Sequence, residues 1–100
     1  MIIVIKFLKK RLKEELENAI DTEIVPHWGS SCDDVTSCIL HMTVNKKSKS
    51  GSAVVAFSGV TCKGTDWYPN GSPFVEYHRV VFKFKDQHIT WWDMRWNYDN

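Results

Sequence analysis

Hydrophobic residues near the start of the chain recur at helical spacing. Between Lys6 and Ile20 they form one stripe, which Ile5 extends, of Leu8, Leu12, Leu16, Ala19 and Ile20. Intervals of three and four residues place apolar side chains on one face of an α-helix. Pro26 prevents a helix from continuing beyond Val25. The pattern predicts an amphipathic helix that ends near residues 18–21, and residues 1–5 fit either a short strand or the start of this helix.

The rest of the chain alternates between apolar and polar residues at strand spacing. This alternation is typical of a half-buried β-strand, and it predicts strands over residues 35–44 and 52–60 and a long hairpin over residues 74–98. Asp86-Gln87 is the expected tight turn of the hairpin. The stretches between these elements are rich in Gly, Pro, Ser, Asn and Asp, which is typical of loops.

Counting outward from the hairpin turn predicts which residues lie opposite one another. A turn of two or four residues gives the pairs Phe84 with Ile89, Phe82 with Trp91, Val80 with Asp93, His78 with Arg95 and Glu76 with Asn97. One face is then apolar near the turn and ionisable at the far end, and the other face is mostly aromatic. A slip of one residue would mix the two sets, because side chains alternate between faces.

One helix followed by four antiparallel strands predicts an α+β fold in a single domain over residues 1–100. The economical architecture is an N-terminal helix packed on one face of a four-stranded meander sheet. This α-β-β-β-β order resembles the cystatin-like arrangement, in which a curved sheet wraps around a helix. The resemblance concerns the order of the elements, and a fold of this kind implies no particular function.

Charged residues are ordinary in number but unevenly placed. Charged residues make up 25% of the chain and the net charge is +1, so no overall field attracts nucleic acid. The five basic residues of positions 1–13, with no acidic ones, are Lys6, Lys9, Lys10, Arg11 and Lys13. Seven acidic residues and no basic ones follow at positions 14–34. The basic group is either a solvated helix face or a patch for an anionic partner.

Cysteine and hydrophobicity patterns favour a protein of the reducing cytoplasm. The chain has three cysteines, its first residues do not follow the order of a signal peptide, and no apolar run approaches the ~20 residues of a membrane span. His27, Cys32, Cys38 and His41 fall close together in sequence, but their spacing is not that of a structural zinc site. On a regular strand, Cys38 and His41 point to opposite faces. We therefore expect no metal and no other cofactor.

A catalytic hypothesis concerns the ionisable end of the hairpin. In the predicted register, a histidine, two carboxylates and an arginine share one patch and could form an acid–base set or line a small-ligand pocket. These residues are Glu76, His78, Asp93 and Arg95. Cross-strand ion pairs are a common alternative explanation for such residues. The chain contains no nucleophile elbow or phosphate-binding loop, so an enzyme is the second interpretation.

The aromatic residues of the hairpin and of the preceding loop favour protein recognition. Trp, Tyr and Arg are enriched at interfaces, and the residues expected to bind a partner are Trp67, Tyr68, Tyr77, Arg79, Trp92, Trp96 and Tyr98. The alternative is that this aromatic face is core, covered by the helix. Nucleic-acid binding through the basic helix and the aromatic hairpin is a third interpretation, which the net charge does not favour.

The leading interpretation is a small non-enzymatic protein-binding module. We expect an inhibitor or modulator of a larger protein, of the accessory kind found in phages and toxin–immunity systems. A homodimer also remains open.

Overall fold

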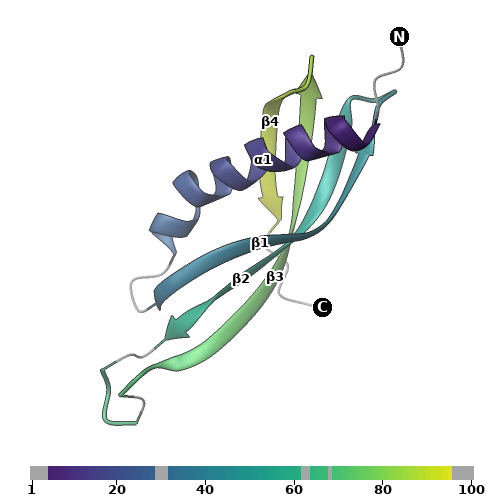
Figure 1. The fold of residues 1–100 in the computed structure, drawn as a ribbon. Helices are drawn as coiled ribbons and strands as arrows, with labels where there is room; N and C mark the ends of the chain where they lie inside the picture. Colours follow the sequence, from purple (N-terminus) through teal and green to yellow (C-terminus); the bar gives the residue numbers. More distant parts are fainter. Residues whose placement is uncertain (1–4, 29–31, 62–63, 68, 96–100) are drawn as a thin grey trace.

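The computed structural model describes residues 5–28, 32–61, 64–67 and 69–95 (Figure 1). Helix α1 (Ile5–Glu23) is followed by a short 3-10 helix, η1 (Val25–His27). The strands are β1 (Cys32–Asn45), β2 (Ser50–Thr61), β3 (Ser72–Lys85) and β4 (His88–Arg95), paired antiparallel in the order β1-β2-β3-β4. The predicted α+β arrangement of one helix on a four-stranded meander is confirmed.

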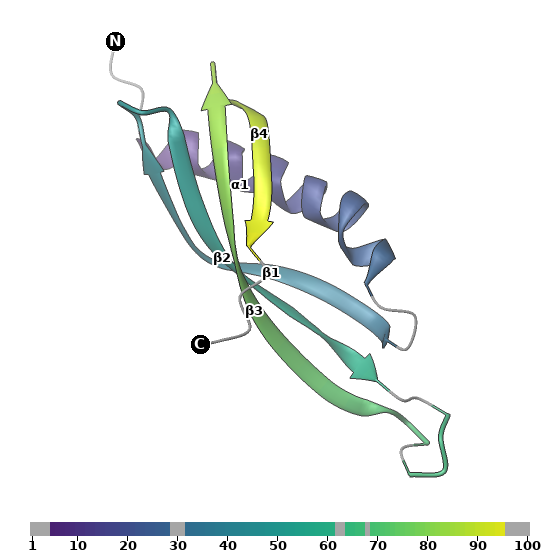
Figure 2. The ribbon, with the colours of Figure 1, turned by 180° about the vertical axis from the view of Figure 1, so that it is seen from behind.

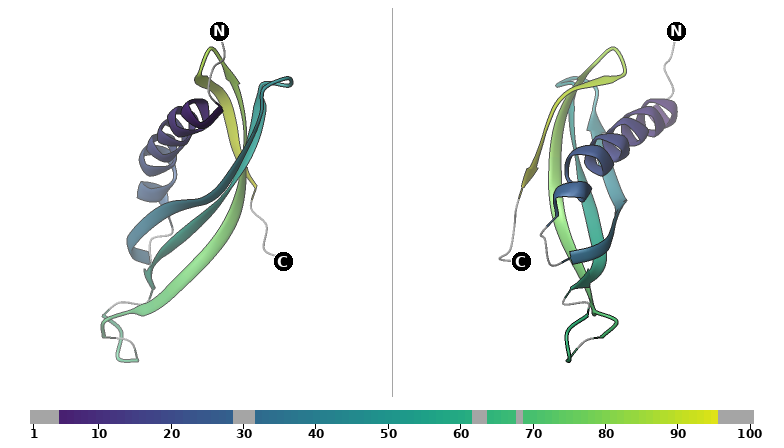
Figure 3. Two further views of the ribbon diagram at one scale, coloured as in Figure 1. Left: turned by 45° about the vertical axis from the view of Figure 1, so that its right-hand side comes forward. Right: turned by 90° about the vertical axis from the view of Figure 1, so that its left-hand side faces the viewer.

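The sheet is bent, and α1 lies across its concave face (Figure 3). Seen from behind, the opposite, convex face carries no helix of the described chain (Figure 2). Strand β4 has 8 residues against the 14 of β3, so β1, β2 and β3 extend beyond β4 as a long arm. The molecule is elongated as a result, with principal extents of 61 × 25 × 19 Å.

The helix is held by the apolar stripe that its spacing predicts. Leu8, Leu12, Leu16 and Ile20 are at most 4% exposed, and they share a core with residues of the sheet's concave face. Those sheet residues are Ile39, Ala53, Val55, Phe57, Val80, Phe82, Phe84 and Met94. Each fully buried leucine or isoleucine contributes about 1.5–3 kcal/mol relative to an exposed one, so this stripe decides which face of the sheet the helix covers.

The register of the hairpin changes after the first two residue pairs, Lys85–His88 and Phe84–Ile89. Asp86 and Gln87 have φ values of 52° and 70°, as in the type I′ turn that matches strand twist, and the predicted pair Phe84–Ile89 is confirmed. The next pair is Lys83 with Trp91, which leaves Thr90 as an extra residue. Thr90 forms a β-bulge, where one strand has an additional residue, and its hydroxyl donates a 3.4 Å hydrogen bond to the Lys83 carbonyl.

The bulge exchanges the two faces of β4. Phe82 pairs with Trp92 and Val80 with Met94, so Trp92 and Met94 share the concave face with these core residues. The predicted pairs Phe82–Trp91, Val80–Asp93 and His78–Arg95 are therefore wrong, because a one-residue shift turns every later side chain over. The predicted pair Glu76–Asn97 lies outside the described residues.

Strand β1 contains a similar irregularity. Ile39 pairs with Val55 and His41 with Val54, which leaves Leu40 as an extra residue that is 55% exposed. Ile39 therefore faces α1, whereas His41 lies on the convex face.

Two carboxylates of α1 fix the helix to the two edge strands. Glu15 accepts a 3.0 Å hydrogen bond from the Ile89 N–H of β4 through Oε1, and its Oε2 lies 2.9 Å from Nδ1 of His88. Asp21 accepts a 2.7 Å hydrogen bond from the Ser37 hydroxyl of β1. The helix is thus tied to both sides of the sheet that it crosses.

We expect Glu15→Ala to lower the free energy of unfolding by about 1–2 kcal/mol, because it leaves the half-buried Ile89 N–H without its acceptor. Glu15→Gln retains an acceptor oxygen and should cost less. Glu14→Ala is the matched control, since Glu14 is exposed. Urea unfolding checks this order, and equal stability of the Glu15→Ala and Glu14→Ala variants would contradict it.

Candidate functional site

The convex face divides into a smooth half and a bulky half. Alternation from the buried residues of β1 and β2 places mostly small side chains outward on these strands, and these are Thr36, Cys38, Thr43, Ser52, Val54, Ala56 and Ser58, together with the larger His41. Cross-strand hydroxyl contacts join Thr36 to Ser58 at 3.2 Å and Thr43 to Ser52 at 3.1 Å. This half offers a surface that a partner's backbone can approach closely.

The bulky half lies over β3 and β4. Val75, Tyr77 and Trp91 are 55%, 59% and 46% exposed, and Arg79 and Lys83 lie on the same face further along β3. The Lys83 ammonium lies 5.7 Å from the centroid of the Trp91 ring, within cation–π range. Exposed Tyr and Trp beside Arg is the composition that recognition surfaces favour.

The residues predicted to bind a partner fall into four groups. Tyr77 and Arg79 lie on the convex face, as a binding role requires. Trp92 lies on the concave face and packs against the core, and Trp67 is 87% exposed in the loop between β2 and β3. Tyr68, Trp96 and Tyr98 lie outside the described residues. Sequence reasoning missed Trp91, because the bulge at Thr90 leaves no mark in the alternation.

The four ionisable residues of the catalytic hypothesis, Glu76, His78, Asp93 and Arg95, do not lie on one patch. Glu76 and His78 lie on the concave face with Val80, whereas Asp93 pairs with Val81 and Arg95 with Arg79 on the convex face. Arg95 forms its ion pair with Asp93 at 3.6 Å. The sheet separates the two halves of the quartet, so the premise of one acid–base set is wrong.

His78 is a packing residue of the concave face. Its side chain is 1% exposed, and its Nε2 lies 3.9 Å from Oε1 of Glu76. The imidazole centroid lies 5.8 Å from that of Phe57 and 6.0 Å from that of Trp28. Trp28 stacks on Phe57 at 4.4 Å, so His78 belongs to an aromatic cluster beside η1. This environment explains why a histidine occupies a core position.

The candidate metal ligands give no site in the described chain. The bulge at Leu40 places Cys38 and His41 on the same face, so the expectation that they point to opposite faces is wrong. Even so, no group of three or more His, Cys, Asp or Glu residues within the described ranges could hold a metal ion. No helix in the described part of the chain is long and apolar enough to cross a membrane.

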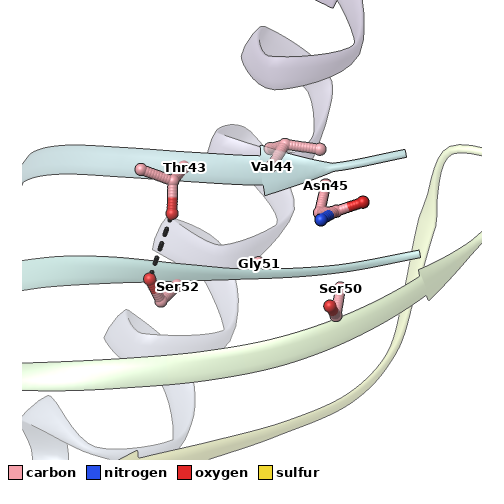
Figure 4. A pocket seen from close by; sticks show the side chains of 6 residues that line it. All are labelled: Thr43, Val44, Asn45, Ser50, Gly51 and Ser52. Carbon is pink, nitrogen blue, oxygen red and sulfur yellow. Dashed lines mark hydrogen bonds between the residues drawn. The ribbon is translucent and has the colours of Figure 1, made fainter. Parts of the chain in front are cut away.

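A shallow pocket lies between the ends of β1 and β2 (Figure 4). It has a volume of about 460 Å³ and is lined by Thr43, Val44, Asn45, Ser50, Gly51 and Ser52. None of these side chains titrates in the physiological range. The pocket therefore offers hydrogen-bonding groups but no general acid or base.

Comparison with known proteins gives no match, whether the chain is set against family models, curated proteins or solved structures. The function is therefore inferred from the surface of the molecule itself.

We expect His78→Ala to lower the free energy of unfolding by about 2–4 kcal/mol, because it leaves a cavity beside Phe57 and Trp28. Glu76→Gln, on the half-exposed neighbour, should cost less than about 1 kcal/mol. Urea denaturation followed by circular dichroism measures both. A His78→Ala variant as stable as the wild type would show that His78 is not a packing residue.

Proposed function

We propose that this protein is a non-enzymatic protein-binding module whose convex face binds a larger protein. The observation that carries the proposal is the placement of α1. Because the helix fills the concave face, Val75, Tyr77 and Trp91 stay exposed on the face that no helix of the described chain covers. Large exposed apolar side chains gathered on one face commonly mark an interaction surface.

The residue types on this face support tight association. Tyr and Trp each bury 150–250 Å² when covered, and such residues with Arg account for most binding hot spots. Tyr77, Arg79 and Trp91 would be the anchors, and the small side chains of β1 and β2 would let the partner's surface lie flat beside them. The binding residues inferred from sequence are revised accordingly, with Trp91 in place of Trp92.

The proposal extends to an inhibitor or modulator of the accessory kind found in phages and immunity systems. A chain of 100 residues whose convex face is exposed can block or alter the activity of a partner. The acid–base alternative loses its basis, because Glu76 and His78 lie on the other face of the sheet from Asp93 and Arg95. A reducing cytoplasm fits the free thiols of Cys32 and Cys38.

Photo-crosslinking tests the face directly. The photoreactive residue benzoylphenylalanine replaces Tyr77 on the convex face in one variant and Phe7 on α1 in another, since these side chains are equally exposed at 59% and 58%. We expect the variant at position 77 to crosslink a specific protein in an extract of the source cells, and the variant at position 7 to give no such product. Crosslinking from position 7 alone would contradict the proposal.

The crosslinked protein is then purified and titrated by calorimetry. Tyr77→Ala and Trp91→Ala should each cost about 2 kcal/mol of binding free energy, as hot-spot residues do. Phe7→Ala should leave affinity unchanged, and all three variants should keep the circular dichroism spectrum of the wild type. Equal losses for Phe7→Ala and Tyr77→Ala would rule out the convex face as the interface.

A further inference from the structure

Most of the positive charge comes from three short stretches of the chain. Ten of the 13 Lys and Arg residues lie on the first half of α1, in the turn between β1 and β2, and at the end of β3. All ten are exposed. They form what we call the basic end, which consists of Lys6, Lys9, Lys10, Arg11, Lys13, Lys46, Lys47, Lys49, Lys83 and Lys85.

The fold brings these stretches to one end of the elongated molecule. The Lys49 carbonyl accepts a 2.9 Å hydrogen bond from the Phe84 N–H, which holds the β1–β2 turn beside the end of β3. The first half of α1 lies at the same end in every view (Figures 1 and 3). The two smaller extents of the molecule are 25 and 19 Å, so it is narrow at right angles to its long axis.

No member of the basic end forms an ion pair within the described chain. The ion pairs among described residues involve His78 with Glu76, His88 with Glu15, and Arg95 with Asp93. Carboxylates do lie close by, since Glu14 follows Lys13 on α1 and Asp86 follows Lys85 in the β3–β4 turn. The cations outnumber these carboxylates, so the basic end is more positive than the net charge of +1 implies.

We propose that the basic end binds nucleic acid through its phosphate backbone. Clustered cations repel one another, and a polyanion relieves this repulsion while releasing its own bound counterions. A molecule 25 Å wide would cover about seven base pairs of duplex at 3.4 Å per pair, with two phosphates for each pair. The basic end adjoins the partner-binding anchors at Lys83, whose ammonium lies 5.7 Å from the Trp91 ring, but the proposal does not depend on the proposed function.

Two observations favour nucleic acid over a membrane surface. A helix that binds lipid presents its apolar face to the bilayer, but the apolar stripe of α1 is buried against the sheet. The β1–β2 turn offers no large apolar side chain that could enter lipid, since residues 46–50 are Lys, Lys, Ser, Lys and Ser. Ile5 and Phe7 of α1 are 41% and 58% exposed, so the basic end is not purely cationic, but ten cations from three segments outnumber these two side chains and suit a line of phosphates.

Fluorescence anisotropy with a labelled 20-base-pair duplex tests the proposal in a salt series that starts at 50 mM. We expect the association constant to fall steeply with salt, with a slope of about −0.9 in log–log form for each phosphate contacted. Lys46→Gln with Lys47→Gln removes two charges from the basic end. This variant should weaken binding about tenfold or more at 50 mM salt and reduce the slope by about two.

Arg79→Gln with Arg95→Gln is the matched control, because it removes the same charge from the middle of the convex face. It should change the affinity less than twofold. The turn itself should persist in the Lys variant, since Asn45 Oδ1 accepts from the backbone N–H groups of Lys47 and Ser48.

Three results would overturn the proposal. One is the absence of duplex binding at 50 mM salt. A second is an equal loss in the Lys and Arg variants, which would mean that the charge acts diffusely. The third is binding to phosphatidylserine vesicles or to polyglutamate that is as tight as, or tighter than, binding to the duplex, which would assign the basic end to a membrane or to an acidic protein.

Discussion

The rest of the structure depends on the packing of α1 against the concave face of the sheet. This packing is made by Leu8, Leu12, Leu16 and Ile20. One helix can cover one face of a four-stranded sheet, so burying this stripe leaves the other face open. The bend of the strands lets Val55, Phe57, Val80 and Phe82 surround the helix. Every functional inference follows from this division, because it separates packing residues such as His78 from exposed ones such as Tyr77.

The elements themselves could be predicted from the sequence, because helix and strand periods differ strongly. The helical stripe, the strand alternation and the Asp86-Gln87 turn all have local causes, and the structure confirms them. The positions of Trp91 and Trp92 could not be predicted, because they depend on the single extra residue Thr90. Because Trp91 and Trp92 are adjacent and of the same type, the alternation of apolar and polar residues is equally consistent with either of them facing the core. The face of His41 depends in the same way on a bulge at Leu40.

The clustering of positive charge in space could not be predicted from the sequence either, but for a different reason. The sequence reveals a basic helix start and a lysine-rich turn as separate features, and its net charge argues against nucleic acid. Topology changes this conclusion. The hydrogen bond from Phe84 to Lys49 and the direction of α1 bring the separate lysines to one end, so local charge differs greatly from the average. Two surfaces of different chemistry, one aromatic and one cationic, then coexist on a small chain.

The central claim is that Trp91 faces outward and Trp92 inward, and fluorine NMR tests it most directly. The protein is labelled with 5-fluorotryptophan, and the two resonances are assigned with Trp91→Phe and Trp92→Phe variants. A soluble gadolinium complex should broaden the Trp91 signal strongly and the Trp92 signal weakly, because Trp91 is 46% exposed and Trp92 packs against the core. Stronger broadening of Trp92 would mean that Thr90 does not form the bulge and that Trp91 packs against the core, and the convex face would then lack its Trp91 anchor.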